Sequence, residues 1–374
     1  MRWASTRSPR TPGLNARRTA RHHPSECSRS TSGVGHHGVM AAKRRPGTGV
    51  RVLRAVLVTI LAIAVIVAVA VVALVVTNPA PEAEPPWQRA ADLPEQRGEV
   101  ASAVAGGELF IIGGLAGVGR TSQAVHAYDP DEDGWRQAPD LPEARHHAAA
   151  AELDGTIYVT GGAESITDWT PRAEVWTLEP GAQRWESVAP MPEGRQGHAM
   201  VALDDRLHVV GGEGPTTEVL TFTPGEGWER GAPLGDNRDH LRAVARDGEV
   251  WALGGRTSGL LDWVDVYEPD TGTWRAGPSL PEPMSAMAVG TLGDAIHVVD
   301  GEDPSLVTGG IIDRHLVLPP DEEEWEEALD SVLAVHGAGY GVIDDELIIA
   351  GGASRQGALS LLSWTEVTQR YAPE

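Results

Sequence analysis

The chain has 374 residues, enough for one large domain or two ordinary ones, and its formal net charge is −23. This charge is unevenly distributed, because residues 1–54 carry 12 basic side chains and one acid, whereas the remaining residues carry 18 basic and 52 acidic side chains. The acidic part repels phosphate backbones, which excludes nucleic acid as its main partner. Cys27 is the only cysteine, which excludes an intrachain disulfide and a zinc site built from cysteines.

The N-terminal segment predicts a basic tail followed by a membrane anchor. Residues 1–54 are rich in Arg, Ser, Pro and His and lack an apolar pattern, so we expect a disordered tail. Residues 55–76 contain one polar side chain, Thr59, and are long enough to cross a bilayer as a single α-helix. A cleaved signal peptide is the alternative, but its apolar region would be about 7–15 residues long. We therefore expect an uncleaved signal-anchor.

The flanking charges predict the orientation of this anchor. Five Lys and Arg residues lie between positions 43 and 54, whereas Glu82 and Glu84 follow the apolar run. The positive-inside rule then places the N-terminus in the cytoplasm and residues 77–374 outside the cell. Residues 77–86 form a Pro-rich linker, which we expect to be extended. The single lysine, against 29 arginines, suggests a high-GC bacterial genome.

A sixfold repeat occupies residues 87–374. Six tryptophans are 43–51 residues apart, and a Gly-Gly pair, or Asp-Gly in the fifth repeat, begins 26 residues after each one. The tryptophans are Trp87, Trp135, Trp185, Trp228, Trp274 and Trp325. All the variation in length falls between the Gly-Gly pair and the next tryptophan. This pattern indicates a constant framework that carries variable loops.

Four strands can be placed in each repeat. A strand of small residues, such as VASAVA at 100–105, is followed by a two-residue turn of Asp or Gly and by an apolar strand that ends at the Gly-Gly pair. A third strand follows the variable loop, and the tryptophan opens a fourth. Small residues suit the innermost strand of a radial array, where strands approach most closely. The repeat therefore predicts six radial sheets.

The pattern resembles the kelch repeat, in which a diglycine is followed by Tyr-Asp-Pro, Trp and Leu-Pro-x-x-Arg. The resemblance covers residues 87–374 and implies an all-β, six-bladed kelch-type β-propeller, here preceded by a single transmembrane α-helix. Asp300 and Met284 depart from the pattern, and the sixth repeat lacks a fourth strand. We expect the Trp87 strand to complete the sixth blade by pairing with a third strand near residues 359–367, because closure removes open sheet edges.

Kelch propellers commonly bind ligands on the face formed by the loops after strands two and four. Arginines recur there ten residues after four tryptophans and acids recur eight residues after, namely Arg97, Arg145, Arg195, Arg238, Glu95, Glu143 and Glu193. The arginines either grip a carboxylate of the ligand or pair with the acids and stabilise the turns between blades. Trp169 and Trp263 lie in or beside the variable loops, where they either stack on a sugar or peptide or cover the rim.

No catalytic or metal-binding motif is evident. The chain lacks a G-x-S-x-G nucleophile elbow and a pair of histidines with the spacing of metalloproteases. His147, His198, His240 and His336 lie near the inner strands, but at 12, 13, 12 and 11 residues after a tryptophan. Because side chains alternate along a strand, we expect these imidazoles to point in different directions and to bind no metal. Galactose-oxidase-like enzymes need copper and a Cys–Tyr crosslink, and no cysteine follows Cys27, so we expect no cofactor.

We therefore expect a membrane-anchored, extracellular binding module for a protein or glycan rather than an enzyme. The alternative is a carbohydrate-active enzyme of the sialic-acid mutarotase or epimerase type. Those enzymes are similar six-bladed kelch rings, and an arginine ring would suit the carboxylate of their sugar. No matching acid–base pair can be placed from the sequence.

Overall fold

The computed structural model describes residues 53–66, 83–117, 119–305 and 310–373, in two units divided after Ile66. In the first unit, residues 53–66 are helical and their apolar side chains are exposed. Within the described residues, no helix is both long and apolar enough to cross a membrane. Residues 53 and 54 of the predicted tail are part of the helix at residues 53–66, whereas residues 1–52 of the tail, residues 67–76 of the predicted anchor and residues 77–82 of the linker lie outside the described residues.

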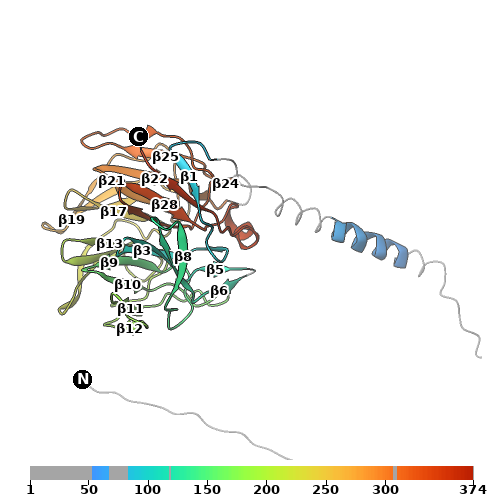
Figure 1. Ribbon diagram of the computed structural model, residues 1–374, viewed down its shortest axis with the longest axis horizontal. Coiled ribbons are helices and arrows are strands. Elements are labelled where there is room, and N and C mark those ends of the chain that lie inside the picture. The colour runs from blue at the N-terminus through green and yellow to red at the C-terminus, as the bar shows by residue number, and fades with distance from the viewer. Residues whose placement is uncertain (1–52, 67–82, 118, 306–309, 374) are drawn as a thin grey trace, which may run out of the picture. The chain divides into compact units, whose positions relative to one another are not determined.

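Six four-stranded antiparallel sheets make up most of the described second unit (Figure 1). Each sheet is a blade whose first-named strand lies at the axis and whose last-named strand lies at the rim. Blades one to three consist of β3 (Ala101–Ala105), β4 (Glu108–Ile112), β7 (Val125–Asp129) and β8 (Gly134–Ala138); β9 (Ala149–Leu153), β10 (Thr156–Thr160), β11 (Val175–Leu178) and β12 (Glu186–Ser187); and β13 (Ala199–Leu203), β14 (Arg206–Val210), β15 (Glu218–Thr223) and β16 (Gly227–Pro233). Blades four to six consist of β17 (Arg242–Arg246), β18 (Glu249–Leu253), β19 (Val264–Glu268) and β20 (Thr273–Ala276); β21 (Ala288–Leu292), β22 (Ala295–Val299), β25 (His315–Leu318) and β26 (Glu326–Glu327); and β27 (Gly339–Ile343), β28 (Glu346–Ala350), β29 (Thr368–Tyr371) and β1 (Trp87–Ala90).

The six inner strands form a closed ring. Each contacts the inner strand of the next blade, in the order β3, β9, β13, β17, β21, β27 and back to β3. Small residues make this approach possible, since a Cβ added to Gly339 on β27 would lie 2.3 Å from Cδ1 of Ile111 on β4. The predicted all-β propeller of six sheets is confirmed, and so is the preference for small residues in the inner strands.

The repeating tryptophans connect neighbouring blades. Each indole Nε1–H donates to the carbonyl that lies four residues after the preceding tryptophan, at 2.8–3.3 Å. The bond from Trp87 to Leu329 O continues this series across the junction of the first and last blades. A framework tryptophan therefore fills the space between two sheets and satisfies one carbonyl of the adjacent blade.

The first strand closes the ring, as predicted. β1 pairs with β29 in the register Trp87 to Tyr371 and Ala90 to Thr368. The predicted position of the third strand at residues 359–367 is wrong, because Gly357–Leu362 form the 3₁₀ helix η1 and the strand begins at Thr368. Leu361 of η1 packs against Trp364, outside the sheet, so this segment does not join the third strand.

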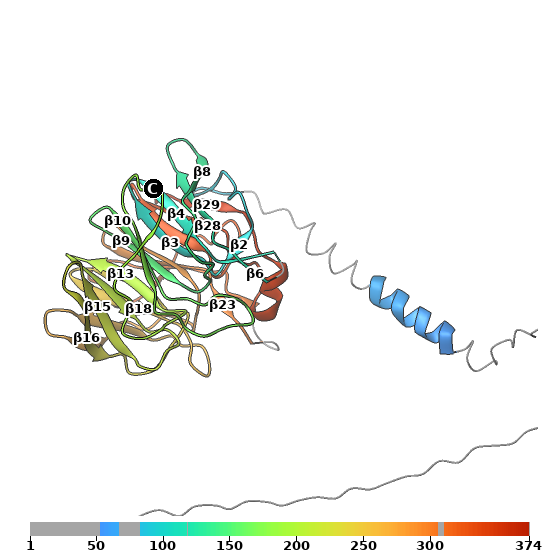
Figure 2. The same cartoon turned by 90° about the horizontal axis from the view of Figure 1, so that it is seen from below.

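Short extra elements lie in the loops between second and third strands and, for β2, in the segment that joins the sixth blade to the first. They are η1, the pair β23 (Glu302–Asp303) and β24 (Gly310–Ile311), and the sheet of β2 (Arg97–Gly98), β5 (Leu115–Ala116) and β6 (Arg120–Thr121). In both views η1, β6 and the β23–β24 pair lie on the same side of the propeller (Figures 1 and 2). We call the surface formed by these loops and by the segments joining successive blades the loop face.

Candidate functional site

Residues from all six blades meet at the axis, each 12 residues after a framework tryptophan. We call them the axial ring: Glu99, His147, Gly197, His240, Ala286 and Gly337. Each has a positive φ between 50° and 60°. From His147 to Gly337, each backbone N–H donates to the carbonyl of the ring residue in the preceding blade, at 2.8–3.1 Å. This chain of hydrogen bonds brings side chains that are distant in the sequence to one point.

Three ring positions carry large side chains on a left-handed backbone. Glu99, His147 and His240 have φ values of 50°, 55° and 53°. Glycine occupies the same position in two of the other blades. Such a conformation costs a non-glycine residue about 1–3 kcal/mol and is often found at functional sites. Here the inter-blade hydrogen bonds hold the backbone in place, so these side chains occupy the axis at a cost in stability.

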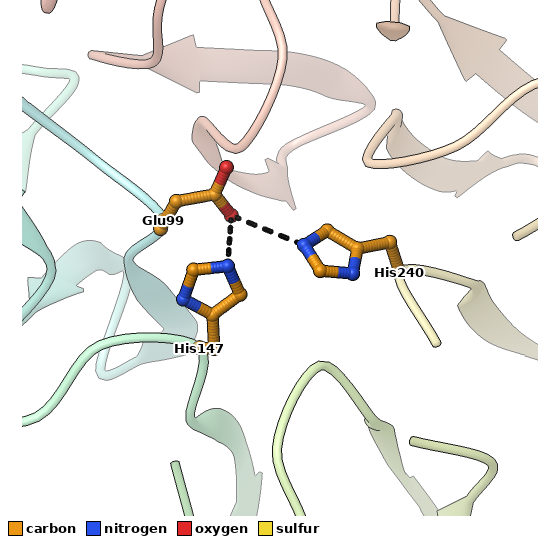
Figure 3. A group of neighbouring side chains, drawn as sticks. All are labelled: Glu99, His147 and His240. Carbon is orange, nitrogen blue, oxygen red and sulfur yellow. Dashed lines mark ion pairs between the residues drawn. The ribbon is translucent and has the colours of Figure 1, made fainter. Parts of the chain in front are cut away.

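The Glu99 carboxylate is surrounded by imidazoles (Figure 3). Its Oε2 lies 3.4 Å from His147 Nε2 and 4.0 Å from His240 Nε2, and its Oε1 lies 3.3 Å from His336 Nδ1. All four side chains are buried. Burial opposes ionisation of Glu99, but the adjacent histidines hold the pKa of its carboxyl well below the usual range. Glu99 is therefore an ionised carboxylate in the interior.

A second layer of charged groups adjoins these residues. His240 Nδ1 lies 2.5 Å from Asp239 Oδ1. Arg256 donates from Nε to Asp239 Oδ1 at 2.8 Å and from Nη1 to Glu302 Oε1 at 3.0 Å, and its Nη2 lies 3.1 Å from His240 Nε2. Isolated β-bridges hold the backbones of Asp239 and Arg256 opposite one another. We call Glu99, His147, His240, His336, Asp239, Arg256 and Glu302 the axial cluster.

Two histidines of the cluster titrate in opposite directions. Burial lowers the pKa of His147 well below its usual value, so its imidazole is neutral at physiological pH. Burial also opposes protonation of His336, but its contact with Glu99 and the charge of Glu302 raise its pKa. The cluster thus contains a neutral imidazole and a more basic one beside the same carboxylate, which are groups suited to proton transfer or metal coordination.

Trp169 lies beside the axial cluster. Its ring centroid is 4.9 Å from that of His146 and 5.2 Å from that of His147, and the residue is 46% exposed. The structure thus places one predicted candidate next to the buried charges, with part of its ring open to solvent. Trp263 lies on the loop between β18 and β19 and is 44% exposed.

The four predicted arginines are buried and bind the protein itself. Arg97 Nη1 donates to the carbonyls of Gly113 and Ala124, and Arg195 Nη2 donates to Glu193 and to the carbonyl of Glu218. Arg145 pairs with Glu143 at 2.8 Å and Arg238 with Asp265 at 3.0 Å. Their side chains are at most 1% exposed. This geometry supports the interpretation that they stabilise turns, and their guanidinium groups are not exposed to a ligand.

The acidic partners of these arginines are more exposed. Glu95 forms an ion pair with Arg120 and also lies near Arg97. The side chains of Glu95 and Glu143 are partly exposed to solvent, whereas that of Glu193 is largely buried. Glu95 and Glu143 therefore remain candidates for contact with a ligand, as predicted from their place in the turns.

The expectation that the histidines point apart is wrong for three of the four. His147, His240 and His336 converge on Glu99, and only His198 lies elsewhere, bonded to Thr160. A signal for this is present in the sequence, since Glu99, His147 and His240 share the spacing of 12 residues from a tryptophan. The spacing of the histidines alone does not reveal it, because the residue on which they converge is a carboxylate.

Comparison with known proteins agrees with this fold. The KLHDC2/KLHL20/DRC7 Kelch-repeats domain matches residues 77–212, and the Kelch motif matches residues 238–281. The chain contains kelch repeats. They resemble those of human Kelch-like protein 33, with 42% identity over 77 residues that cover 20% of this chain and 14% of the relative. Mouse Kelch-like protein 35 is 31% identical over 171 residues, covering 35% and 30% of the two chains.

The two family models match within residues 77–281. The chain spans at most 30% of the length of the two curated relatives. The solved structure of YjhT is similar, with a TM-score of 0.63 and 15% identity, over 75% of this chain and 96% of that one. This likeness shows a shared kelch-type fold.

Proposed function

We propose that the kelch propeller is a binding module that captures a protein partner on its loop face. Kelch proteins generally mediate protein interactions, and one observation on this chain supports the choice of face. Among the described residues after 82, the large apolar side chains that are exposed all lie on loop-face segments: Trp169, Trp263, Leu329, Leu359 and Leu362. Exposed apolar side chains gathered on one face are typical of an interaction surface, and tryptophan contributes strongly to binding energy.

A groove on the same face adds to this argument. It has a volume of about 660 Å³ and lies between the loops of blades four and five, where Leu260 and Ile311 line it together with Glu282, Asp303 and Arg314. A mixture of apolar and charged side chains suits a peptide segment of a partner protein. Glycan is the other ligand class that this surface could hold, because exposed tryptophans also stack on sugars.

The proposal includes a membrane anchor and an extracellular location. The apolar composition of residues 55–76 and the basic residues before them support a single-pass anchor with its N-terminus in the cytoplasm. Labelling of Cys27 tests this topology, because it is the only thiol. In intact cells an impermeant maleimide is expected to leave Cys27 unmodified and to label a cysteine introduced at Ala372. Labelling of Cys27 alone would contradict the orientation.

Binding is tested by capture of partners from cell-surface extracts with the full chain and with the double variant Trp169→Ala, Trp263→Ala. The expected result is at least a tenfold loss of captured protein in the double variant. Arg184→Ala is the matched control, because Arg184 is exposed in the turn between β11 and β12 and lies away from the loop face. Equal capture by the double variant, or retention of glycans instead of proteins, would overturn the proposal of a protein partner.

A second candidate function is an enzyme of the sialic-acid mutarotase type. The axial cluster favours it, because Glu99 and His336 supply the pair of acid and base groups that sequence reasoning could not place. Arg256, which is bonded to Asp239 and Glu302 and whose side chain is 24% exposed, is a cationic group of the cluster that reaches solvent and suits a sugar carboxylate. Exchange of N-acetylneuraminate anomers followed by NMR tests this function. Acceleration that Glu99→Gln abolishes supports it, and a rate equal to that of buffer removes it.

A further inference from the structure

Three ligand atoms of metal-binding type face one another inside the axial cluster. Glu99 offers a carboxylate oxygen, and His147 and His240 each offer a ring nitrogen, all within 4.8 Å of one another (Figure 3). In a tetrahedral zinc site with bonds of about 2.1 Å, ligand atoms lie roughly 3.4 Å apart. His147 Nε2 is already at that distance from the carboxylate, and His240 Nε2 lies 4.0 Å from it. Small side-chain rotations would complete the set.

Second partners hold the imidazoles with one nitrogen toward Glu99. His240 Nδ1 is bonded to the Asp239 carboxylate at 2.5 Å, which leaves Nε2 as the inward nitrogen. His147 Nδ1 lies 2.6 Å from His146 Nδ1, and again Nε2 faces Glu99. A carboxylate behind a coordinating histidine fixes its tautomer and increases its basicity in many metal sites. The cluster contains this arrangement around His240.

The charge of the cluster also favours a cation. The cluster contains three carboxylates, Glu99, Asp239 and Glu302, and a single guanidinium, that of Arg256, which bonds to Asp239 and Glu302. The carboxylates of the cluster outnumber its guanidinium by two, and a divalent cation would balance this excess of negative charge. Arg256 Nη2 lies 3.1 Å from His240 Nε2 and would have to give up that contact, while its bonds to Asp239 and Glu302 can stay.

The axial position makes this set more than a chance cluster. Each ligand comes from a different blade, and each occupies the same left-handed position of the axial ring, where Gly197, Ala286 and Gly337 stand in the other blades. A Cβ added at Gly337 would lie 2.7 Å from the carboxyl carbon of Glu99, so the glycine there lets this carboxylate occupy the axis. His336 contacts the second oxygen of Glu99 at 3.3 Å and orients the carboxylate.

We propose that Glu99, His147 and His240 form a binding site for a divalent metal ion of the zinc type. Imidazole with carboxylate selects zinc and neighbouring transition metals over magnesium or calcium, which prefer all-oxygen ligands. Asp239 is a positioning residue for His240. This metal site does not rest on the proposed protein partner, although Trp169 of the loop face packs against His147.

Zinc content tests the site. The full chain is stripped with a chelator, dialysed against buffered Zn²⁺ and analysed by mass spectrometry of the metal. The number of zinc ions per chain is expected to be higher by one in the wild type than in the double variant His147→Asn, His240→Asn. Asparagine is chosen because it tolerates the left-handed backbone of these positions. The N-terminal histidines and Cys27 are present in both proteins, so the difference reports the axial site.

Two further variants make the result specific. His208→Asn removes a buried histidine that contacts Thr221 on β15, and it should bind zinc like the wild type. Asp239→Asn should weaken binding at least tenfold without removing a ligand. Equal zinc content in the wild type and the folded double variant would overturn the proposal. If the double variant does not fold, wild-type crystals soaked in zinc decide: an anomalous peak between Glu99, His147 and His240 supports the site, and none there overturns it.

Discussion

At the scale of single residues, the same repeat position has different roles in different blades. Ten residues after the tryptophan, four blades place a buried arginine that donates to backbone carbonyls or pairs with an acid, while the sixth blade has Val335. There Asp300, which replaces a framework glycine of the fifth blade, accepts hydrogen bonds from Val335 N and Ser331 Oγ. A carboxylate from one blade thus contacts the turn that the arginine stabilises elsewhere.

Replacing Arg195 by methionine should destabilise the propeller by about 3 kcal/mol. The carbonyls of Gly211 and Glu218 would lose their donor, and Glu193 would lose one of its partners in a covered site. Urea unfolding measures the change. Arg184→Met, at a side chain that is 83% exposed, is the control and should change stability by less than about 0.5 kcal/mol. Similar effects of the two substitutions would contradict a structural role for the buried arginine.

The buried carboxyl of Asp300 should make the stability of the propeller depend on pH. Burial raises the pKa of this carboxyl well above the ordinary value of 3.8, so the folded state binds the proton more tightly than the unfolded state. The stability contributed by Asp300 is therefore greatest in acid and is lost as the pH rises above 3.8. Asp300→Asn should remove this loss. The melting temperature of the variant relative to that of the wild type should therefore rise between about pH 4 and about pH 7. A constant difference across this range would refute the prediction.

At the scale of elements, strand order within each blade follows from short-range signals. The two-residue turns between first and second strands have a positive φ at their first residue in all six blades, between 49° and 60°, and Asp or Gly occupies each one. The third strand of the last blade was harder to place, because the loop before it contains η1 and its length is free to vary. A loop insertion changes no contact inside the sheet, so spacing alone could not locate this strand.

Substitution of Trp87 tests how much β1 contributes to the stability of the closed ring. Trp87 is 1% exposed, packs on Tyr371 and His315, and donates to Leu329 O in the adjacent blade. Trp87→Ala should cost about 4 kcal/mol because it leaves a large cavity, while Trp87→Phe should cost less because it keeps most of the ring. Calorimetry of both variants measures the effect. Trp263→Ala is the control at a tryptophan that is 44% exposed, and it should change the melting temperature little; an equal loss there would contradict the argument.

At the scale of the whole molecule, closure depends on pairing between the two ends of the propeller. β1 is joined to β29 by backbone hydrogen bonds, and no disulfide is available, since the chain has one cysteine. Deleting residues 87–90 would leave β29 as an open edge, which invites pairing with another chain.

The expected result of that deletion is association or aggregation, detected by light scattering after size exclusion. A peptide of residues 83–96 added in excess should restore the monomer by occupying the edge of β29. A deletion variant that stays monomeric and melts like the wild type would show that the first strand is not required for closure.

The number of blades, the order of their strands and the strand that closes the ring can all be predicted from the sequence. These features follow from spacing along the chain, because each blade is built from consecutive residues whose turns, small residues and tryptophans act locally. Repeat spacing leaves open whether the four arginines grip a ligand or stabilise turns, and their burial among carbonyls and acids supports the second interpretation. The axial cluster becomes visible in the folded chain, although three of its members share a spacing of 12 residues from a tryptophan. Glu99, His147, His240 and His336 come from different blades, and the distances between their side chains depend on how six sheets close around an axis, which no local pattern encodes.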